Sequence, residues 1–387
     1  MNPKFKRLFE TVTFPNGATI NSRFAMGPMV VVGSQLNGEI GDDDLAYWER
    51  RNDSGSLLIT GATAVSEYSD AYGNGLKLHQ DELLNGWKKL ANIMKAKGNR
   101  AIVQLFHAGY RANFTYKDKG VAYSASTKEY PFLDYPVTGM TESQIKTTLD
   151  EFAAAAKRVI EAGFDGIEIH GANRYLIHQF FSSVSNIRDD QWGGSLANRA
   201  RFALEVVKRI QAVIKEHAKP DFILGYRISP EEIHREGNGF TFDEALYLIN
   251  QIAQIGVDYF NVSQSGVRSF AASAKAGIYM GQPINQIIKT QLNGRALLLA
   301  SGDLTHPDKI LEAVMDYADI ASSATMVLID PDTKNKIQSG HENDVSLAID
   351  ETTIDDLKLP KEFYKIAPMV VTSELIPQKT KDLIYKK

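Results

Sequence analysis

The sequence predicts an α/β fold, and within that class a (β/α)8 or TIM barrel with an N-terminal hairpin and long loops on its C-terminal face. Three observations predict this fold. Short apolar runs alternate with longer amphipathic segments along the chain. The apolar runs show little polar alternation, as expected for parallel strands that are buried on both faces. Eight strand–helix units occur in sequence, and eight is the number that closes a parallel sheet into a barrel.

The predicted strands are short and apolar throughout. This pattern is typical of a buried parallel sheet, in which neither face of a strand meets water. In chain order we expect strands at Phe24–Met29, Leu57–Gly61, Ala101–Phe106, Gly166–His170, Phe222–Ile228, Tyr259–Val262, Ala296–Ala300 and Ile320–Ser323.

The longer segments between these strands carry helix start and stop signals. Thr141 with Gln144, and Thr241 with Glu244, fit the N-cap and N3 pattern of a capping box. Gly98 follows one helical segment at the left-handed position that often ends a helix. The predicted helices are Asp42–Arg51, Asp81–Lys97, Glu142–Ala162, Leu196–Glu216, Phe242–Ile255, Pro283–Leu292, Pro307–Tyr317 and Pro331–Gln338.

The connections between the predicted elements are uneven in length. Residues 14–18 contain an Asn-Gly turn between β-type runs, so we expect a small hairpin that plugs the floor of the barrel. Long loops follow the third, fourth and sixth strands, at residues 107–140, 171–194 and 263–282, and in a barrel all three gather on one face. The many aromatic residues in the first of these loops favour a packed lid.

The strand–helix pattern predicts the domain organisation. Residues 1–340 are expected to form a single barrel domain. Residues 341–387 have no place in the barrel, and we expect this extension to pack on the barrel or on a partner subunit in a homodimer. A doubly wound open sheet is the alternative architecture, but no Gly-rich dinucleotide-binding turn follows any early strand.

Composition and missing motifs exclude several classes of protein. The 387 residues are 43% hydrophobic, enough for a sizeable core, and a net charge of −4 gives no reason to expect nucleic acid or an anionic membrane as a partner. The chain has no cysteine, which excludes disulfides, thiolate zinc sites and Cys-ligated iron–sulfur clusters. No run of ~18 apolar residues and no signal-like N-terminus occurs, so we expect a cytoplasmic protein. HExxH and GxSxG motifs are absent, and no metal site is predicted.

Three kinds of polar side chain crowd the end of the fourth predicted strand. The strand ends at His170, and Asn173 and Tyr175 follow closely. Barrel enzymes keep their chemistry at the carboxyl ends of the strands, so this segment locates the candidate site. His170 and Asn173 can donate to one ligand oxygen on which charge builds, and Tyr175 can supply a proton. The alternative is a core histidine beside an Asn-stabilised turn, with Tyr175 packing through its ring.

Charged and amide side chains interrupt other buried strands. Gln104 either bonds to neighbouring backbone or faces a flat heterocycle whose edge presents donors and acceptors, and its position alone does not decide between them. Arg227 ends its strand without a flanking carboxylate, which favours an anion-stabilising role over a structural ion pair. Glu168 is the one residue of the fourth strand that would suit a flavin-free aldolase or isomerase, and we expect it instead to form an internal ion pair.

Eight segments resemble, in one order, the old yellow enzyme family of FMN-dependent oxidoreductases. They are NSRFAMGPM, GEIGDDDLAYWERR, LLITGATAV, QLFHAG, AGFDGIEIHGANRYLIHQF, WGGSLANRARF, GYRISPEE and GVDYFNVS, spread from about Leu8 to Asp330. Each motif alone is weak, but this many in order are specific. The family has the (β/α)8 fold, and the resemblance implies an NAD(P)H-dependent enzyme with FMN as its cofactor.

The resemblance implies how the chain holds the flavin ring. The matching contacts are the backbone of Pro28, Met29 and Ala62, the amide of Gln104 at the pyrimidine edge, and Arg227 near N1 and the C2 carbonyl. Reduced flavin is anionic around N1, so a fixed cation at that place stabilises the reduced state. Together with His170, these residues are therefore the expected set of contacts to the flavin ring.

The resemblance also implies a ping-pong reaction with a small-molecule acceptor. NAD(P)H reduces the flavin and leaves, and the acceptor then enters the same pocket. His170 and Asn173 match the pair that binds the carbonyl oxygen of an α,β-unsaturated substrate, and Tyr175 matches the tyrosine that protonates Cα after flavin N5 delivers hydride to Cβ. The expected acceptors are activated alkenes such as enones and enals, quinones, and nitro compounds.

The sequence departs from the family pattern beside the expected site. Val30 stands near the flavin where a small residue, Thr or Cys is usual. Tyr110 replaces the familiar Arg after the HAG motif. Arg174 stands where Gly is usual, between Asn173 and Tyr175, which places a charge by the site that can select acidic acceptors.

The largest departure concerns the FMN phosphate. The Gly-Arg of the family corresponds here to Ala324 and Thr325, and Gly302 is kept in the preceding unit but is followed by Asp303. Loss of a charged donor reduces the binding free energy by ~1.5–3 kcal/mol, which lowers the affinity about 10- to 100-fold. Backbone N–H groups and hydroxyls remain as donors to the phosphate. We therefore expect FMN to bind more weakly than usual. The alternative function is a barrel with weakened or lost cofactor binding that acts as a binding or regulatory protein.

Overall fold

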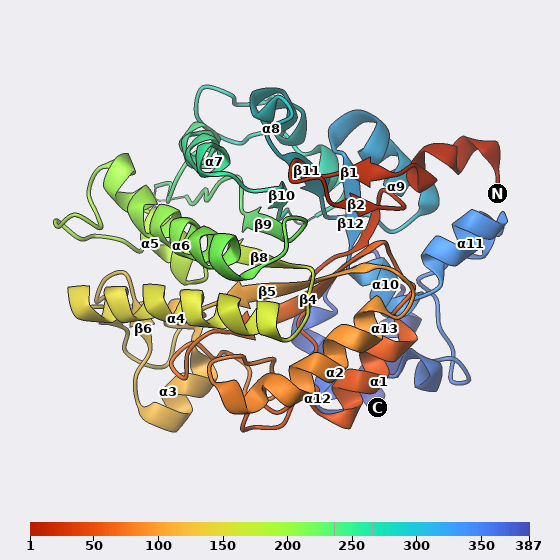
Figure 1. Cartoon of the computed structure of the whole chain (residues 1–387), viewed down its shortest axis with the longest axis horizontal. Helices are drawn as coiled ribbons and strands as arrows, with labels where there is room; N and C mark the ends of the chain where they lie inside the picture. The colour runs from red at the N-terminus through yellow and green to blue at the C-terminus, as the bar shows by residue number, and fades with distance from the viewer. Residues whose placement is uncertain (236, 265) are drawn as a thin grey trace.

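The barrel predicted from the sequence is present in the computed structural model, which describes residues 1–235, 237–264 and 266–387. Each barrel strand pairs in parallel with the next strand of the barrel along the chain, and the last pairs with the first, so the sheet is closed (Figure 1). The barrel strands are β3 (Phe24–Met26), β4 (Leu57–Ala64), β5 (Arg100–Phe106), β8 (Gly166–Gly171), β9 (Ile223–Ile228), β10 (Tyr259–Val262), β11 (Leu297–Ala300) and β12 (Ile320–Ser323). The predicted fold class, an α/β (β/α)8 barrel, is confirmed.

The predicted helices form on the outside of this barrel with small shifts at their ends. The last predicted helix begins at Thr333 rather than Pro331, and the helix before it continues as a wider π-type turn over Ala313–Tyr317. The helices of the described residues are α1 (Asp42–Arg50), α2 (Leu84–Lys95), α3 (Asn113–Lys119), α4 (Glu142–Glu161), α5 (Leu176–Phe181), α6 (Leu196–His217), α7 (Phe242–Ile255), α8 (Ile284–Leu292), α9 (Pro307–Glu312), α10 (Thr325–Ile329), α11 (Thr333–Ser339), α12 (Lys361–Val370) and α13 (Gln378–Lys386). Helices α3, α5, α10, α12 and α13 were not predicted.

Strand β3 ends at Met26, three residues earlier than predicted. Gly27 and Pro28 follow, and proline has no backbone N–H with which to continue the ladder. A Cβ atom at Gly27 would lie 2.8 Å from Ser322 Oγ, so the chain passes β12 too closely for a larger residue. The chain therefore leaves the sheet here and brings Pro28 to the mouth of the barrel.

The predicted hairpin closes the opposite end of the barrel. Strands β1 (Val12–Thr13) and β2 (Thr19–Ile20) pair antiparallel around a turn in which Gly17 has a φ of +88°. Apolar residues of the hairpin form one buried cluster with inward-facing strand residues, and the rings of Phe14 and Tyr259 lie 6.1 Å apart. A ligand can therefore approach the barrel axis from the C-terminal face.

Asp44, in the first turn of α1, is a carboxyl group enclosed by protein. It accepts hydrogen bonds from Ser34 Oγ at 2.7 Å and from the backbone N–H of Gly41 at 3.2 Å, and it is 2% exposed. Burial disfavours its charged form and raises its pKa to about 7, in spite of these hydrogen bonds, which lower it.

We expect Asp44→Asn to remove a pH dependence of stability. Because folding raises the pKa of Asp44, its contribution to stability is complete below an unfolded pKa of roughly 4 and is lost as the pH rises through about 7. Between pH 5 and pH 8 the free energy of unfolding of the natural protein should fall by about 3 kcal/mol relative to that of the variant. Denaturant titrations at both pH values measure this difference, and parallel pH profiles of the two proteins would contradict it.

The C-terminal segment 341–387 packs against helices of the barrel. Arg51, fully buried at the end of α1, donates to the carbonyl oxygens of Leu357 at 2.7 Å and Leu328 at 2.9 Å. Phe363 of α12 is also fully buried, and the backbone N–H of Lys361, the first residue of α12, donates to Asp43 Oδ2 of α1 at 3.1 Å. We therefore propose that this segment is an extension of the barrel domain, while a homodimer stays a prediction.

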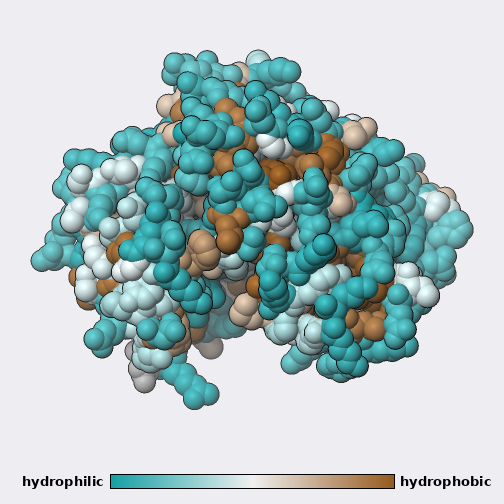
Figure 2. Space-filling model, turned by 90° about the horizontal axis from the view of Figure 1, so that it is seen from below, coloured by the Kyte–Doolittle hydropathy of each residue, from teal (hydrophilic) through white to brown (hydrophobic). Residues whose placement is uncertain are grey.

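The face shown in Figure 2 is mainly hydrophilic. Its apolar side chains lie in separate patches between hydrophilic ones. Because these patches are separate, this face offers no single broad apolar surface for a partner. Within the described residues, no helix combines the length and apolar character needed to cross a membrane.

Candidate active site

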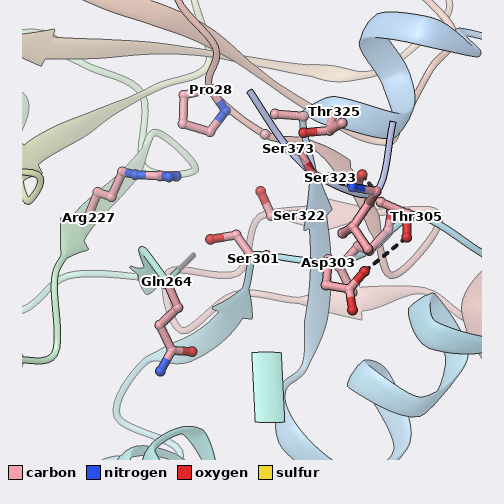
Figure 3. A pocket seen from close by; sticks show the side chains of 15 residues that line it. Pro28, Arg227, Gln264, Ser301, Asp303, Thr305, Ser322, Ser323, Thr325 and Ser373 are labelled. Carbon is pink, nitrogen blue, oxygen red and sulfur yellow. Dashed lines mark hydrogen bonds between the residues drawn. The ribbon is translucent and has the colours of Figure 1, made fainter. Parts of the chain in front are cut away.

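A cavity lies at the carboxyl ends of β9, β11 and β12, on the face where the sequence places the site (Figure 3). Arg227 enters it from β9, Pro28 borders it from the segment after β3, and most of its other polar side chains are hydroxyls. The lining residues are Gly27, Pro28, Arg227, Gln264, Ser301, Gly302, Asp303, Leu304, Thr305, Ser322, Ser323, Ala324, Thr325, Ser373 and Leu375.

Three buried polar atoms in this cavity have no hydrogen-bond partner among the described residues. They are Arg227 Nη1, Gln264 Oε1 and Ser322 Oγ. Native proteins rarely leave buried polar atoms without a hydrogen bond. Because all three residues line one cavity, the cavity suits a polar ligand that supplies both acceptors and a donor.

Asp303, the carboxylate that follows Gly302, has hydrogen-bond partners within the protein. Its carboxylate accepts from Lys309 Nζ at 2.7 Å, from Thr305 Oγ1 at 3.0 Å and from the backbone N–H of Arg268 at 2.7 Å. Burial raises the pKa of Asp303, but these partners outweigh burial and hold the pKa below its usual value. Lys309 therefore balances the charge of this carboxylate.

His170 lies near the end of β8, directly beside Arg227 in the register of β8 and β9. Burial lowers the pKa of His170 well below its usual value, and the charge of Arg227 lowers it further. The backbone N–H of Ala172 donates to His170 Nδ1 at 3.2 Å, so the neutral ring carries its proton on Nε2. His170 therefore presents a neutral N–H donor.

Asn173 is oriented by a relay of hydrogen bonds that begins at Arg227. Arg227 Nη2 donates to Ser263 Oγ at 3.1 Å, and Ser263 Oγ donates to Asn173 Oδ1 at 2.9 Å. Since the amide oxygen accepts from Ser263, the NH2 group of Asn173 remains available as a donor. Ser263 was not among the predicted site residues, although its place directly after a barrel strand was a usable signal.

Tyr175 forms a hydroxyl pair with Tyr72, a residue of the loop after β4. The two oxygens lie 2.6 Å apart. Burial raises the pKa of Tyr72 well above its usual value, and Tyr175 raises it further. The Tyr175 ring packs edge-on against His170, with centroids 4.9 Å apart, and shares an apolar cluster with Ala62. His170 and Tyr175 thus lie together, and Tyr72 is a neighbour that no sequence pattern marked.

Gln104 points to Glu168 inside the barrel. Its Nε2 donates to Glu168 Oε1 at 2.6 Å, and Asn261 Nδ2 donates to the other carboxylate oxygen at 2.9 Å. Burial raises the pKa of Glu168. Two amide hydrogen bonds hold this carboxyl group, which corrects the expected internal ion pair. Gln104 and Met29 do not line the cavity described above, so their ligand contacts stay predictions.

Comparison with known proteins identifies the family. The sequence model of the NADH:flavin oxidoreductase / NADH oxidase family matches residues 7–344. The chain belongs to this family. An uncharacterised oxidoreductase of Streptococcus pyogenes is 35% identical over 99% of this chain and 97% of its own length. A probable NADH-dependent flavin oxidoreductase of Bacillus subtilis is 32% identical over 98% of this chain and 100% of its own length.

Solved structures agree with this fold. The old yellow enzyme homologue of Zymomonas mobilis has a TM-score of 0.75 at 20% identity, with coverage of 92% of this chain and 98% of that one. The resemblance to the old yellow enzyme family is confirmed by the family match. As a member of the NADH:flavin oxidoreductase family, the chain is an NAD(P)H-dependent enzyme that uses FMN.

The C-terminal extension of this flavin oxidoreductase contributes to the cavity, although it lies far along the chain from the predicted motifs. Ser373 and Leu375, from the C-terminal segment, line the cavity beside the barrel residues. No sequence pattern predicted these two residues, because only the packing of the extension brings them to the cavity. In the described part of the chain, no group of three or more His, Asp or Glu side chains could hold a metal ion.

Proposed function

We propose that this flavin oxidoreductase transfers hydride from NAD(P)H to an activated alkene such as an enone or enal, with quinones and nitro compounds as further acceptors. The observation that carries the proposal is the grouping of His170, Asn173 and Tyr175 beside the Arg227 cavity. Reduction of a polarised double bond needs donors for the oxygen on which negative charge develops and an acid for the carbon. These three side chains supply those groups.

FMN supplies the hydride when it is bound. Its fit to this chain rests on Arg227 Nη1 and Ser322 Oγ, which have no partner among the described residues and can meet the polar edge of the ring and the ribityl phosphate chain. Gly302, Ala324 and Thr325 line the same cavity and are the proposed phosphate contacts. Arg227 is the one cationic side chain among the described residues that line this cavity, and Thr325 stands where the family has arginine, which supports weaker FMN binding than usual.

The remaining proposed flavin contacts border this region. Pro28 lines the cavity, and Ala62 belongs to the apolar cluster around Tyr175, which supports a ring placed between them. Met29 and Gln104 complete the proposed set. The unpartnered polar atoms of the cavity favour this enzyme over a barrel that has lost its cofactor.

Each polar side chain of the site has one proposed task. His170 stays neutral because its pKa is lowered, and it donates through Nε2 to the carbonyl oxygen of the acceptor. Asn173 donates its NH2 group to the same oxygen, because Ser263 fixes the amide oxygen. Tyr175 gives its proton to the carbon next to the carbonyl.

Anaerobic half-reactions test this proposal. Protein loaded with FMN should be yellow, NADH or NADPH should bleach the flavin absorbance, and 2-cyclohexenone should restore it. Colour that neither nicotinamide bleaches would contradict an oxidoreductase of this kind. Recovery with a benzoquinone but not with any enone or enal would refute the alkene as the acceptor class.

A further inference from the structure

The turn between β8 and α5 carries a side chain that its backbone disfavours. Asn173 and Arg174 have φ angles of +58° and +60°, and the backbone N–H of Tyr175 donates to the carbonyl oxygen of Ala172 at 3.2 Å. Two central residues with positive φ are typical of a type I′ turn, which favours Asn followed by Gly. Arg174 occupies the position that glycine fits without strain, so a contribution from its side chain must offset that strain.

Arg111 and Arg174 place two guanidinium groups at the outer end of the site. Arg111 Nη1 donates to the carbonyl oxygen of Asn173 at 3.1 Å, and its guanidinium carbon lies 5.6 Å from the centre of the Tyr175 ring. Both arginines line an open cleft that also contains Asn173 and Gln264. Gln264 lines the inner cavity as well, so the cleft and the cavity meet there.

The positive charge at this outer end is only partly balanced. Arg174 Nε lies 3.5 Å from Glu232 Oε1, but Glu232 also lies 3.2 Å from His178 and 2.9 Å from His234. Burial raises the pKa of Glu232, yet His178 and the other hydrogen-bond partners outweigh burial and hold it at about 2. In the described part of the chain, no carboxylate forms an ion pair with Arg111 within 4.0 Å. Arg174 therefore shares its carboxylate with two histidines, and Arg111 has no carboxylate partner among the described residues.

We propose that Arg111 and Arg174 form an anion-binding subsite that selects acceptors with a carboxylate near the double bond. The forked guanidinium group matches a carboxylate in geometry and charge. Since Arg111 lies over the Tyr175 ring, a carboxylate close to the carbon that Tyr175 protonates comes within its reach. The inference rests on the function proposed above and adds the substrate class, an unsaturated acid with a second, activating carbonyl group.

Monomethyl fumarate and dimethyl fumarate isolate the contribution of charge, because they differ only in one carboxylate in place of an ester. The informative variants are Arg174→Gly and Arg111→Gln, with Arg111→Lys to restore the charge. Arg174→Gly relieves the positive φ, so loss of folding cannot explain its result. Arg209→Ala is the matched control, because Arg209 pairs with Asp150 on the outer helices and its removal changes the net charge equally.

The subsite predicts a selective loss. In Arg174→Gly and Arg111→Gln, kcat/KM for monomethyl fumarate should fall about 10- to 100-fold, while kcat/KM for dimethyl fumarate stays unchanged. Arg111→Lys should recover part of the loss, and Arg209→Ala should show none. Higher ionic strength should weaken the preference of the natural protein for the monoester. Equal losses for both esters, or no loss for either, would overturn the subsite.

The diphosphate of NAD(P)H is the other anion that could meet these arginines. Under the proposal, NADH and NADPH bleach the flavin of the variants at the rate of the natural protein. Slower bleaching, with equal losses for both fumarate esters, would assign the arginines to the dinucleotide and refute an acceptor subsite.

Calorimetry of monomethyl succinate, a saturated analogue, measures binding to the subsite without any alkene reduction. Weaker binding in the variants supports the subsite even if the proposed function fails, and unchanged binding overturns it.

Discussion

Replacing Tyr175 with Phe should slow the reduction of an enone about 100-fold or more, while reduction of a quinone changes little. An enone needs a proton on carbon after it accepts hydride, and the Tyr175 hydroxyl is the proposed source. A quinone gives oxygen anions, which take up protons from water. The substitution keeps the aromatic ring that packs against His170 with centroids 4.9 Å apart, so the loss reports on the proton rather than on packing.

Stopped-flow oxidation of the reduced enzyme by 2-cyclohexenone and by a benzoquinone measures both rates. Tyr72→Phe is the matched control, because it removes the hydroxyl that lies 2.6 Å from that of Tyr175 but leaves the Tyr175 proton in place. Its enone rate should fall far less than that of Tyr175→Phe. If Tyr175→Phe slowed both acceptors equally, Tyr175 would not be the proton donor to carbon.

The parts of the fold that local chemistry determines were predictable from the sequence. Buried parallel strands leave uninterrupted apolar runs, and the capping box predicted at Thr141 forms, with the backbone N–H of Gln144 donating to its Oγ1 at 3.3 Å. Helix α10 was missed, because its stability depends on distant contacts such as the bond from Arg51 to the carbonyl oxygen of Leu328. No local sequence pattern indicates a hydrogen-bond partner 277 residues away.

The candidate site was likewise only partly predictable from the sequence. His170 and Arg227 could be placed at the mouth because each lies near the end of a strand, and the barrel register makes them neighbours. Ser263 and Tyr72 reach their partners across 90 and 103 residues, so only closure of the barrel reveals them. The place of Gln104 within a buried strand was predictable, but the carboxylate of Glu168 that accepts from its amide group was not.

The second large effect should follow from His170→Ala combined with Asn173→Ala. Removal of both donors leaves the oxygen of the acceptor without stabilisation as its negative charge develops, so enone reduction should slow roughly 100- to 1,000-fold. Bleaching of the flavin by NAD(P)H should stay partly intact, because neither residue is proposed to hold the phosphate or the Arg227 edge of the ring. Binding of phenols, which offer an oxygen to the same donors, should weaken as well.

Ser263→Ala gives the graded control for this double variant. It removes the hydroxyl that donates to Asn173 Oδ1 at 2.9 Å, so the amide can rotate while His170 remains, and the enone rate should fall less. Separate stopped-flow measurements of flavin bleaching and reoxidation distinguish the roles, since equal losses in both half-reactions would assign His170 and Asn173 to the cofactor.

Because the pKa of His170 is lowered and its neutral ring is the donor, the natural enzyme should show no loss of enone rate as the pH rises through 6.5. A decline there would mean that a protonated imidazole is the donor.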